Sequence, residues 1–157
     1  MIRDIRRNGE QPKDTMHTAA CENLITGMGV IIKDEKTVDY PSSETVSNIY
    51  IATKERYPSG LNAARTDMSD YDDDFVKIHK GEHLGLERYT DGEKFSTDQF
   101  KTTDFESATA GMAVSVGTDG LWMKSTVDSK YVFEKSMMDN GHKLVVIRVE
   151  SDAVAHA

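Results

Sequence analysis

The chain has 157 residues, a formal net charge of -8 and an apolar share of 38%, which together describe one foldable domain and not a disordered polymer. An acidic chain has no general attraction to nucleic-acid phosphates or anionic lipids, so we expect neither direct nucleic-acid binding nor membrane association. A single cysteine, Cys21, excludes an intrachain disulfide and a zinc site built from several cysteines, and fits synthesis in a reducing cytoplasm. We find no apolar run that could span a bilayer and no apolar segment typical of a secretory signal.

The first 20 residues are polar and carry several basic side chains, while Gly9 and Pro12 interrupt any periodic pattern. We therefore expect residues 1–20 to form an extended arm, either frayed or ordered on a neighbouring subunit. Residues 21–157 then form a single β-rich domain. The basic residues that the arm offers to a partner are Arg3, Arg6, Arg7 and Lys13.

Strand patterns follow the arm. Residues 28–33 are rich in β-branched side chains, and residues 47–53 alternate Ile49 and Ile51 with other residues, so both ranges predict strands. Residues 75–80 and 84–88 keep a period of two on either side of Gly81. This pattern indicates two strands about a bend or one strand bulged at the glycine.

The second half repeats this style. Residues 112–116 and 121–124 flank a connection with two glycines and predict a hairpin. Residues 131–134 and 144–149 predict two more strands, joined through the favoured turn pair Asn140 and Gly141. The only helical candidate is a short turn within residues 97–110, so the sequence favours an antiparallel β-barrel or β-sandwich with at most one short helix.

Segment 67–74 concentrates five carboxylates without a basic residue. Asp70, Asp72 and Asp74 have the first, third and fifth spacing of a calcium loop, but Phe75 stands where that loop needs glycine. Three interpretations stay open: a solvated acidic loop, a weak cation site, or a surface that docks a basic partner through Asp72, Asp73 and Asp74.

No catalytic motif is complete. His79 and His83 are four residues apart, but Gly81 and the strand pattern argue against a shared helical face for a metal. Ser115 lacks the preceding glycine of a nucleophile elbow. Trp122 is expected in the core, and if exposed it would be an interface anchor. We therefore expect no catalytic residues, no cofactor and no metal centre.

Three segments, residues 1–15, 59–89 and 110–125, resemble the small head proteins that tailed phages and prophages of Gram-positive bacteria encode beside their major capsid protein. These are decoration or cement proteins. The resemblance implies a β-rich, non-enzymatic protein that binds the outer surface of the capsid, often as a trimer, and stabilises it. Its partners would be the major capsid protein and copies of itself, contacted through the basic arm residues, the acidic segment and Trp122. It would be made in the host cytoplasm and end in the virion. Alternatives are a head-completion or tail protein and a cation-dependent module for small ligands or carbohydrates.

Overall fold

The computed structural model describes residues 1–8, 14–54 and 76–156. The fold is mainly β, with antiparallel sheets of which one curls like half of a barrel, and with one short helix in the described part of the chain. The predicted fold class is therefore confirmed. None of the described helices is long and apolar enough to cross a membrane.

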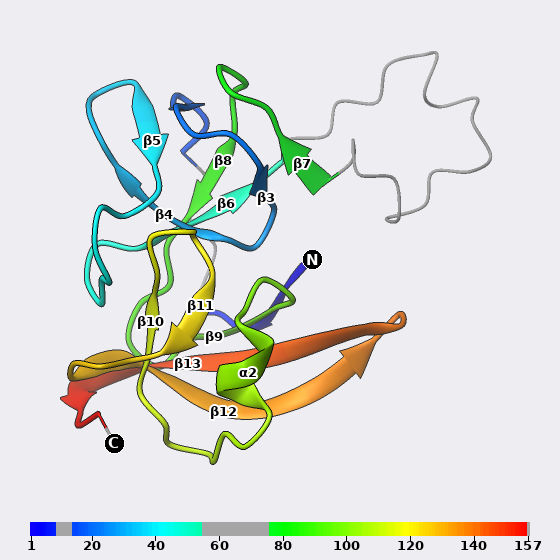
Figure 1. The fold of residues 1–157 in the computed structure, drawn as a ribbon, viewed down its shortest axis with the longest axis vertical. Helices are drawn as coiled ribbons and strands as arrows, with labels where there is room; N and C mark the ends of the chain where they lie inside the picture. Colours follow the sequence, from blue (N-terminus) through cyan, green and yellow to red (C-terminus); the bar gives the residue numbers. More distant parts are fainter. Residues whose placement is uncertain (9–13, 55–75, 157) are drawn as a thin grey trace.

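A four-stranded antiparallel sheet forms one half of the molecule (Figure 1). Its order is β1 (Ile2–Arg6), β9 (Lys94–Thr97), β13 (His142–Val154) and β12 (Ser129–Asp139). β9 pairs with β13 only over Val145–Arg148, whereas β12 follows β13 as far as the Asn140–Gly141 turn. The end of the β12–β13 hairpin therefore extends beyond β9 as a two-stranded ribbon.

A five-stranded sheet forms the other half, and its strands are short. In order they are β2 (Thr18–Ala19), β5 (Thr37–Asp39), β4 (Gly29–Ile32), β6 (Tyr50–Thr53) and β8 (Gly85–Glu87), with only β2 and β5 parallel. A separate pair, β3 (Leu24–Ile25) and β7 (Lys77–Ile78), lies beside it.

The hairpin of β10 (Val114–Val116) and β11 (Trp122–Lys124) joins the two halves. Its turn contacts β4, because the Gly29 amide donates to the Gly120 carbonyl at 2.9 Å. Gly120 has a φ of +76°, a conformation that glycine adopts without steric cost. The helix α2 (Thr102–Phe105) precedes this hairpin and buries Phe105.

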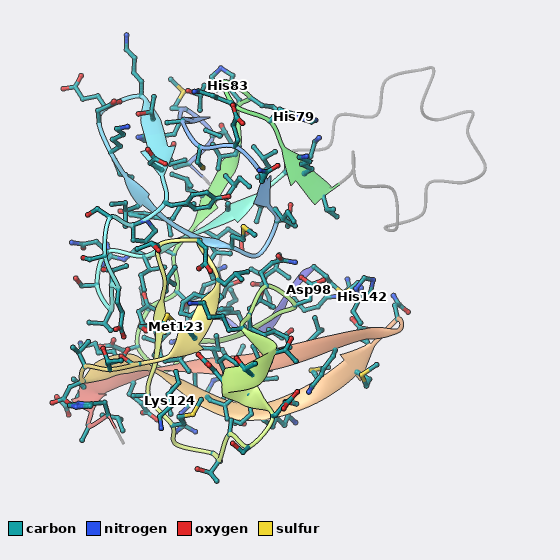
Figure 2. The ribbon with its side chains drawn as sticks, in the orientation of Figure 1. His79, His83, Asp98, Met123, Lys124 and His142 are labelled. Atoms are coloured by element: carbon teal, nitrogen blue, oxygen red, sulfur yellow. The ribbon has the colours of Figure 1, made fainter. Side chains whose placement is uncertain are left out.

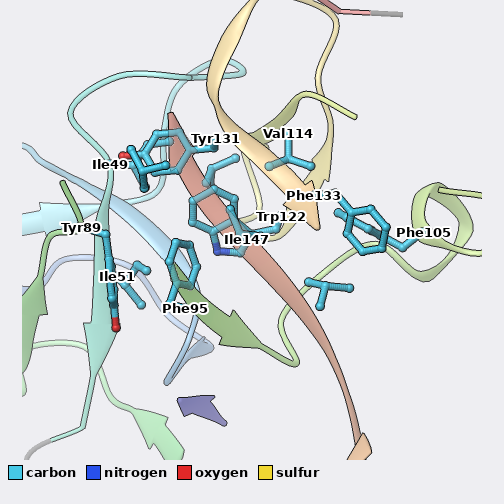
Figure 3. Packing of buried hydrophobic residues seen from close by; sticks show 13 residues of the cluster. Ile49, Ile51, Tyr89, Phe95, Phe105, Val114, Trp122, Tyr131, Phe133 and Ile147 are labelled. Atoms are coloured by element: carbon cyan, nitrogen blue, oxygen red, sulfur yellow. The ribbon is translucent and has the colours of Figure 1, made fainter. Parts of the chain in front are cut away.

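Two apolar clusters stabilise these halves. The first surrounds Trp122 and Phe95, whose ring centroids are 5.3 Å apart, and includes Phe133 and Ile147 (Figure 3). The second lies in the half with the five-stranded sheet and includes Val30, Ala52 and Leu84. Burial of this apolar area is the main favourable contribution to folding.

The arm expected at residues 1–20 is in large part paired with the rest of the chain. Residues 2–6 are extended, as expected, but they form β1 against β9, because the backbone groups at that edge of β9 would otherwise lack partners. Asp14 bridges to Leu86 and Thr18 bridges to His83. Residues 9–13, including Lys13, lie outside the described part.

The predicted strands at 28–33, 112–116, 121–124, 131–134 and 144–149 are confirmed, the last two as parts of longer strands. The strand predicted at 47–53 is confirmed only over Tyr50–Thr53, because Asn48 has a φ of 54° and residues 47–49 precede the strand. Of the two interpretations around Gly81, the bend is the observed one. Gly81 has a φ of +82°, and β7 and β8 pair with different partners, β3 and β6.

Candidate interaction surfaces

The basic residues predicted to bind a partner are used in different ways. The Arg3 Nε donates to Asp139 Oδ2 at 2.8 Å, which attaches β1 to the tip of the β12–β13 ribbon. Arg6 is exposed. Arg7 is held among groups of its own chain.

Arg7 lies in a polar cluster between β1 and β8. Its guanidinium lies 4.4 Å from the ring centroid of Tyr89 and 3.5 Å from Glu87 Oε2. The Tyr89 hydroxyl donates to Asp4 and to Glu87. Burial of the phenol and the hydrogen bond to Asp4 raise the pKa of Tyr89. Arg7 therefore joins β1 to the strand β8, and its role in binding a partner stays a prediction.

Trp122 is fully buried, with 0% of its surface exposed. It packs against Phe95 and Tyr131, with ring centroids 5.3 Å away in each case. A surface anchor must reach its partner, so Trp122 is a core residue and not a docking residue. The register explains this, since Trp122 opposes the buried Val116 across the β10–β11 hairpin.

Ser115 is bound to Glu44 and not to a histidine base. Its Oγ donates to Glu44 Oε1 at 2.7 Å, the Ser125 hydroxyl donates to the same oxygen at 3.0 Å, and Thr126 donates from its amide at 2.8 Å and from its hydroxyl. Partial burial favours the protonated acid, but these hydrogen bonds outweigh it and lower the pKa of Glu44 to about 2. The arrangement fastens the loop before β6 to the hairpin.

The histidines and aspartates lie in separate places. His79 and His83 are exposed beside the five-stranded sheet, whereas His142 lies at the ribbon tip, where its Nδ1 is 3.4 Å from Asp98 (Figure 2). Among the described residues, no group of three or more histidine, cysteine, aspartate or glutamate side chains could hold a metal ion. Asp70, Asp72, Asp73 and Asp74 lie outside the described residues.

A cleft of about 290 Å³ lies between β1 and His142 on one side and the β3–β7 pair on the other. The amino group of Met1 bonds Asp98 there, and it also donates to the Thr26 carbonyl at 3.4 Å. The remaining walls come from Ile25, Val76 and Gln99. The Met1 amino group therefore links Asp98, next to β9, to Thr26, next to β3, and so connects the two halves of the molecule.

A wider groove of about 700 Å³ lies where the loop before β6 meets the ends of β8, β12 and β13. We call it the Arg88 groove. Arg88, Asn48 and Lys130 are exposed at its rim, while Tyr131 and Val149 form part of its buried floor. Asn48 has a φ of 54°, a conformation that asparagine tolerates better than most side chains.

Two polar groups of the Arg88 groove stand without hydrogen-bond partners in the described chain. The Arg88 guanidinium lies 5.8 Å from the ring centroid of Tyr50 and has no carboxylate partner among the described residues. The hydroxyl of Tyr131 likewise has none, although 92% of that residue is covered, leaving 8% exposed. Burial raises the pKa of Tyr131, and the nearby charge of Arg88 opposes this shift.

The sequence did not point to this groove. Arg88, Tyr131 and Asn48 come from three separate segments, and no spacing motif joins them. The one local signal is an asparagine directly before a strand, a residue type that tolerates a left-handed backbone. Comparison of the chain with protein-family models, with curated proteins and with solved structures finds no match.

Proposed function

We propose that this chain is a decoration protein of a tailed-phage head. It binds the outer surface of the capsid, with the major capsid protein and further copies of itself as partners, and it stabilises the assembled shell. The resemblance of residues 1–15, 59–89 and 110–125 to this class of head protein supports the proposal. Synthesis in the host cytoplasm and a final location in the virion belong to the same proposal.

The observation that carries the proposal is the β12–β13 ribbon. It extends beyond β9, and Met138 near its tip is 66% exposed. Arg3 of β1 bonds Asp139 beside it, so the ribbon is fixed to the sheet. A fixed ribbon with an exposed methionine suits contact with a neighbour, because burying a methionine side chain contributes about 1.5 to 3 kcal/mol.

Several side chains of types that enzymes use in catalysis are instead bonded within this chain, and these bonds also support an adhesive function. Glu44, Ser115 and the fully buried Glu93 each bond groups of their own chain, Glu93 accepting from the Thr90 amide at 2.7 Å. Their bonds stabilise loops and turns. A protein whose task is adhesion requires such rigidity, since ordering a flexible surface on binding costs free energy.

Reconstitution tests the proposal. Purified chain is mixed with expanded heads that lack it, the heads are sedimented, and bound chain is quantified. We expect saturable binding of the wild-type chain and binding weakened about tenfold or more by Met138→Ser, since that variant loses an apolar contact. Met16→Ser is the matched control, because Met16 is 78% exposed on the other half of the molecule.

Absence of saturable binding to expanded heads would refute the decoration function. Equal losses in both methionine variants would show that the ribbon is not the contact. A head-completion or tail protein would bind instead at a few copies on heads that contain a portal, which the same sedimentation measures as a low plateau.

A further inference from the structure

The Arg88 groove is a local exception to the charge of the molecule. The whole chain carries a net charge of -8, so most of its surface repels an acidic partner. At the groove, Arg88 and Lys130 bring two positive charges against the single carboxylate of Asp91, which lies 3.8 Å from Lys130. Asp91 pairs with Lys130, and the charge of Arg88 is left for a ligand.

The groove also offers a hydrogen-bond donor that the chain itself does not use. The Tyr131 hydroxyl is held by a phenol that is 8% exposed and packed against Trp122. Its position is therefore fixed by the core. A guanidinium and a fixed phenol hydroxyl together recognise a carboxylate, because both donate to oxygen and bonds to a charged acceptor are the strong ones.

The size and floor of the groove favour a peptide over a sugar or a lone anion. A volume of about 700 Å³ exceeds the needs of a single small ion and falls in the range of protein sites for larger ligands. Sugar binding would call for an exposed aromatic face, whereas Tyr89 is 4% and Tyr131 is 8% exposed. The amide of Asn48 and the hydroxyl of Thr90 at the rim can bond a peptide backbone.

From these observations we infer that the Arg88 groove docks an acidic peptide segment of the partner, with a carboxylate held between Arg88 and Tyr131. The inference rests on the proposed function for the source of that segment, namely the capsid surface. Recognition within the groove can be measured on the isolated chain.

The test is a titration of isotope-labelled chain followed by nuclear magnetic resonance, with a hexaglutamate peptide as the probe and a hexaglutamine peptide as its neutral control. We expect shifts of amide signals confined to residues 46–48, 88–91 and 130–131, and none of comparable size with hexaglutamine. Arg88→Gln should weaken binding about tenfold and Tyr131→Phe about threefold or more. Lys36→Gln removes an exposed cation that does not line the groove and should leave binding unchanged.

Shifts spread over the whole surface, equal shifts with hexaglutamine, or unchanged affinity in Arg88→Gln and Tyr131→Phe would overturn the inference. Inorganic phosphate that competes fully at equal concentration would also overturn it, in favour of a small-anion site. The spectrum of each variant reports whether it is folded. If Arg88→Gln does not fold, Tyr131→Phe, which removes only an oxygen, decides whether the groove binds the peptide. Heads that bind the wild type and Arg88→Gln equally would refute the groove and leave the decoration function standing.

Discussion

Glu44 connects three segments that are far apart in the sequence. It accepts hydrogen bonds from Ser115, Ser125 and Thr126, and its carboxylate is the common acceptor at the base of the β10–β11 hairpin. Loss of such a charged acceptor leaves donors without partners, which is more costly than the bond itself is favourable.

Glu44→Gln should lower the free energy of unfolding at neutral pH by about 1 to 3 kcal/mol. Hydrogen bonds lower the pKa of Glu44 in the folded chain from an ordinary value of 4.5 to about 2. The stabilisation by its charge is therefore complete above pH 4.5 and is lost as the pH falls towards 2. Urea denaturation of wild type and variant at a series of pH values measures the difference.

The control for that series is Glu106→Gln, since Glu106 is exposed. It should change the urea midpoint little at any pH. A wild-type advantage over Glu44→Gln that stays constant from pH 6 down to pH 3 would show that the charge of Glu44 is not what holds the hairpin.

Trp122 is the single tryptophan of the chain, which makes its burial directly measurable. Because it is 0% exposed and packed among aromatic rings, we expect blue-shifted emission in the folded state and little quenching by iodide. Unfolding should shift the emission to the red and make it quenchable. Strong quenching in the folded state would instead show that Trp122 is exposed to solvent.

Single residues differed in how far the sequence could place them. The apolar neighbours of Trp122 made a core position the favoured one, and that interpretation is confirmed. The sequence could not show that Arg7 is held by Tyr89 and Glu87, because these residues lie 80 or more positions from Arg7. The Arg7 bond to the Arg88 carbonyl spans a separation of 81.

At the scale of elements, the turn of the β10–β11 hairpin determines how the two sheets meet. Gly120 would place a Cβ atom 2.8 Å from Tyr40 Cε1 and 3.2 Å from the Gly29 carbonyl oxygen. The first distance would force the Tyr40 ring to shift, and the second is a tight contact with a backbone atom of β4. Any other residue at position 120 would strain this packing, because the position also has a φ of +76°.

Gly120→Ala should destabilise the chain by about 2 to 4 kcal/mol, through its positive φ and through the contact with Tyr40. Gly111→Ala provides the comparison, since Gly111 has a φ of +96° but nothing within 4 Å of the added Cβ. It should cost about 1 to 2 kcal/mol. Thermal or urea unfolding of both variants gives the difference, and equal losses would mean that the hairpin turn does not pack on the five-stranded sheet.

Elements with a strong local pattern were predictable. The apolar run before Arg148 predicted β13, and the glycines at 117 and 120 predicted the β10–β11 hairpin, both of which the structure confirms. β1 was expected to belong to an extended arm, either frayed or ordered on a neighbouring subunit, because residues 1–20 are polar and Gly9 and Pro12 break any periodic pattern. It becomes a strand through pairing with β9, a tertiary effect that no local window contains.

At the scale of the whole molecule, the described structure is a two-part β scaffold whose halves meet at the β10–β11 hairpin and at the contacts of Met1 and Arg7, with a ribbon and a basic groove on its surface. The ribbon follows from the register of β12 and β13, and the groove from the meeting of three segments. The predicted acidic segment, Asp70 to Asp74, lies outside the described residues, so its proposed docking role stays a prediction.

The most direct test of the decoration function is the number of copies of this chain in purified phage particles, measured by quantitative mass spectrometry against the major capsid protein. A decoration protein occupies a repeated position, so we expect a copy number that scales with the capsid protein by a fixed simple ratio. Particles without the chain, or with only a few copies each, would contradict that function.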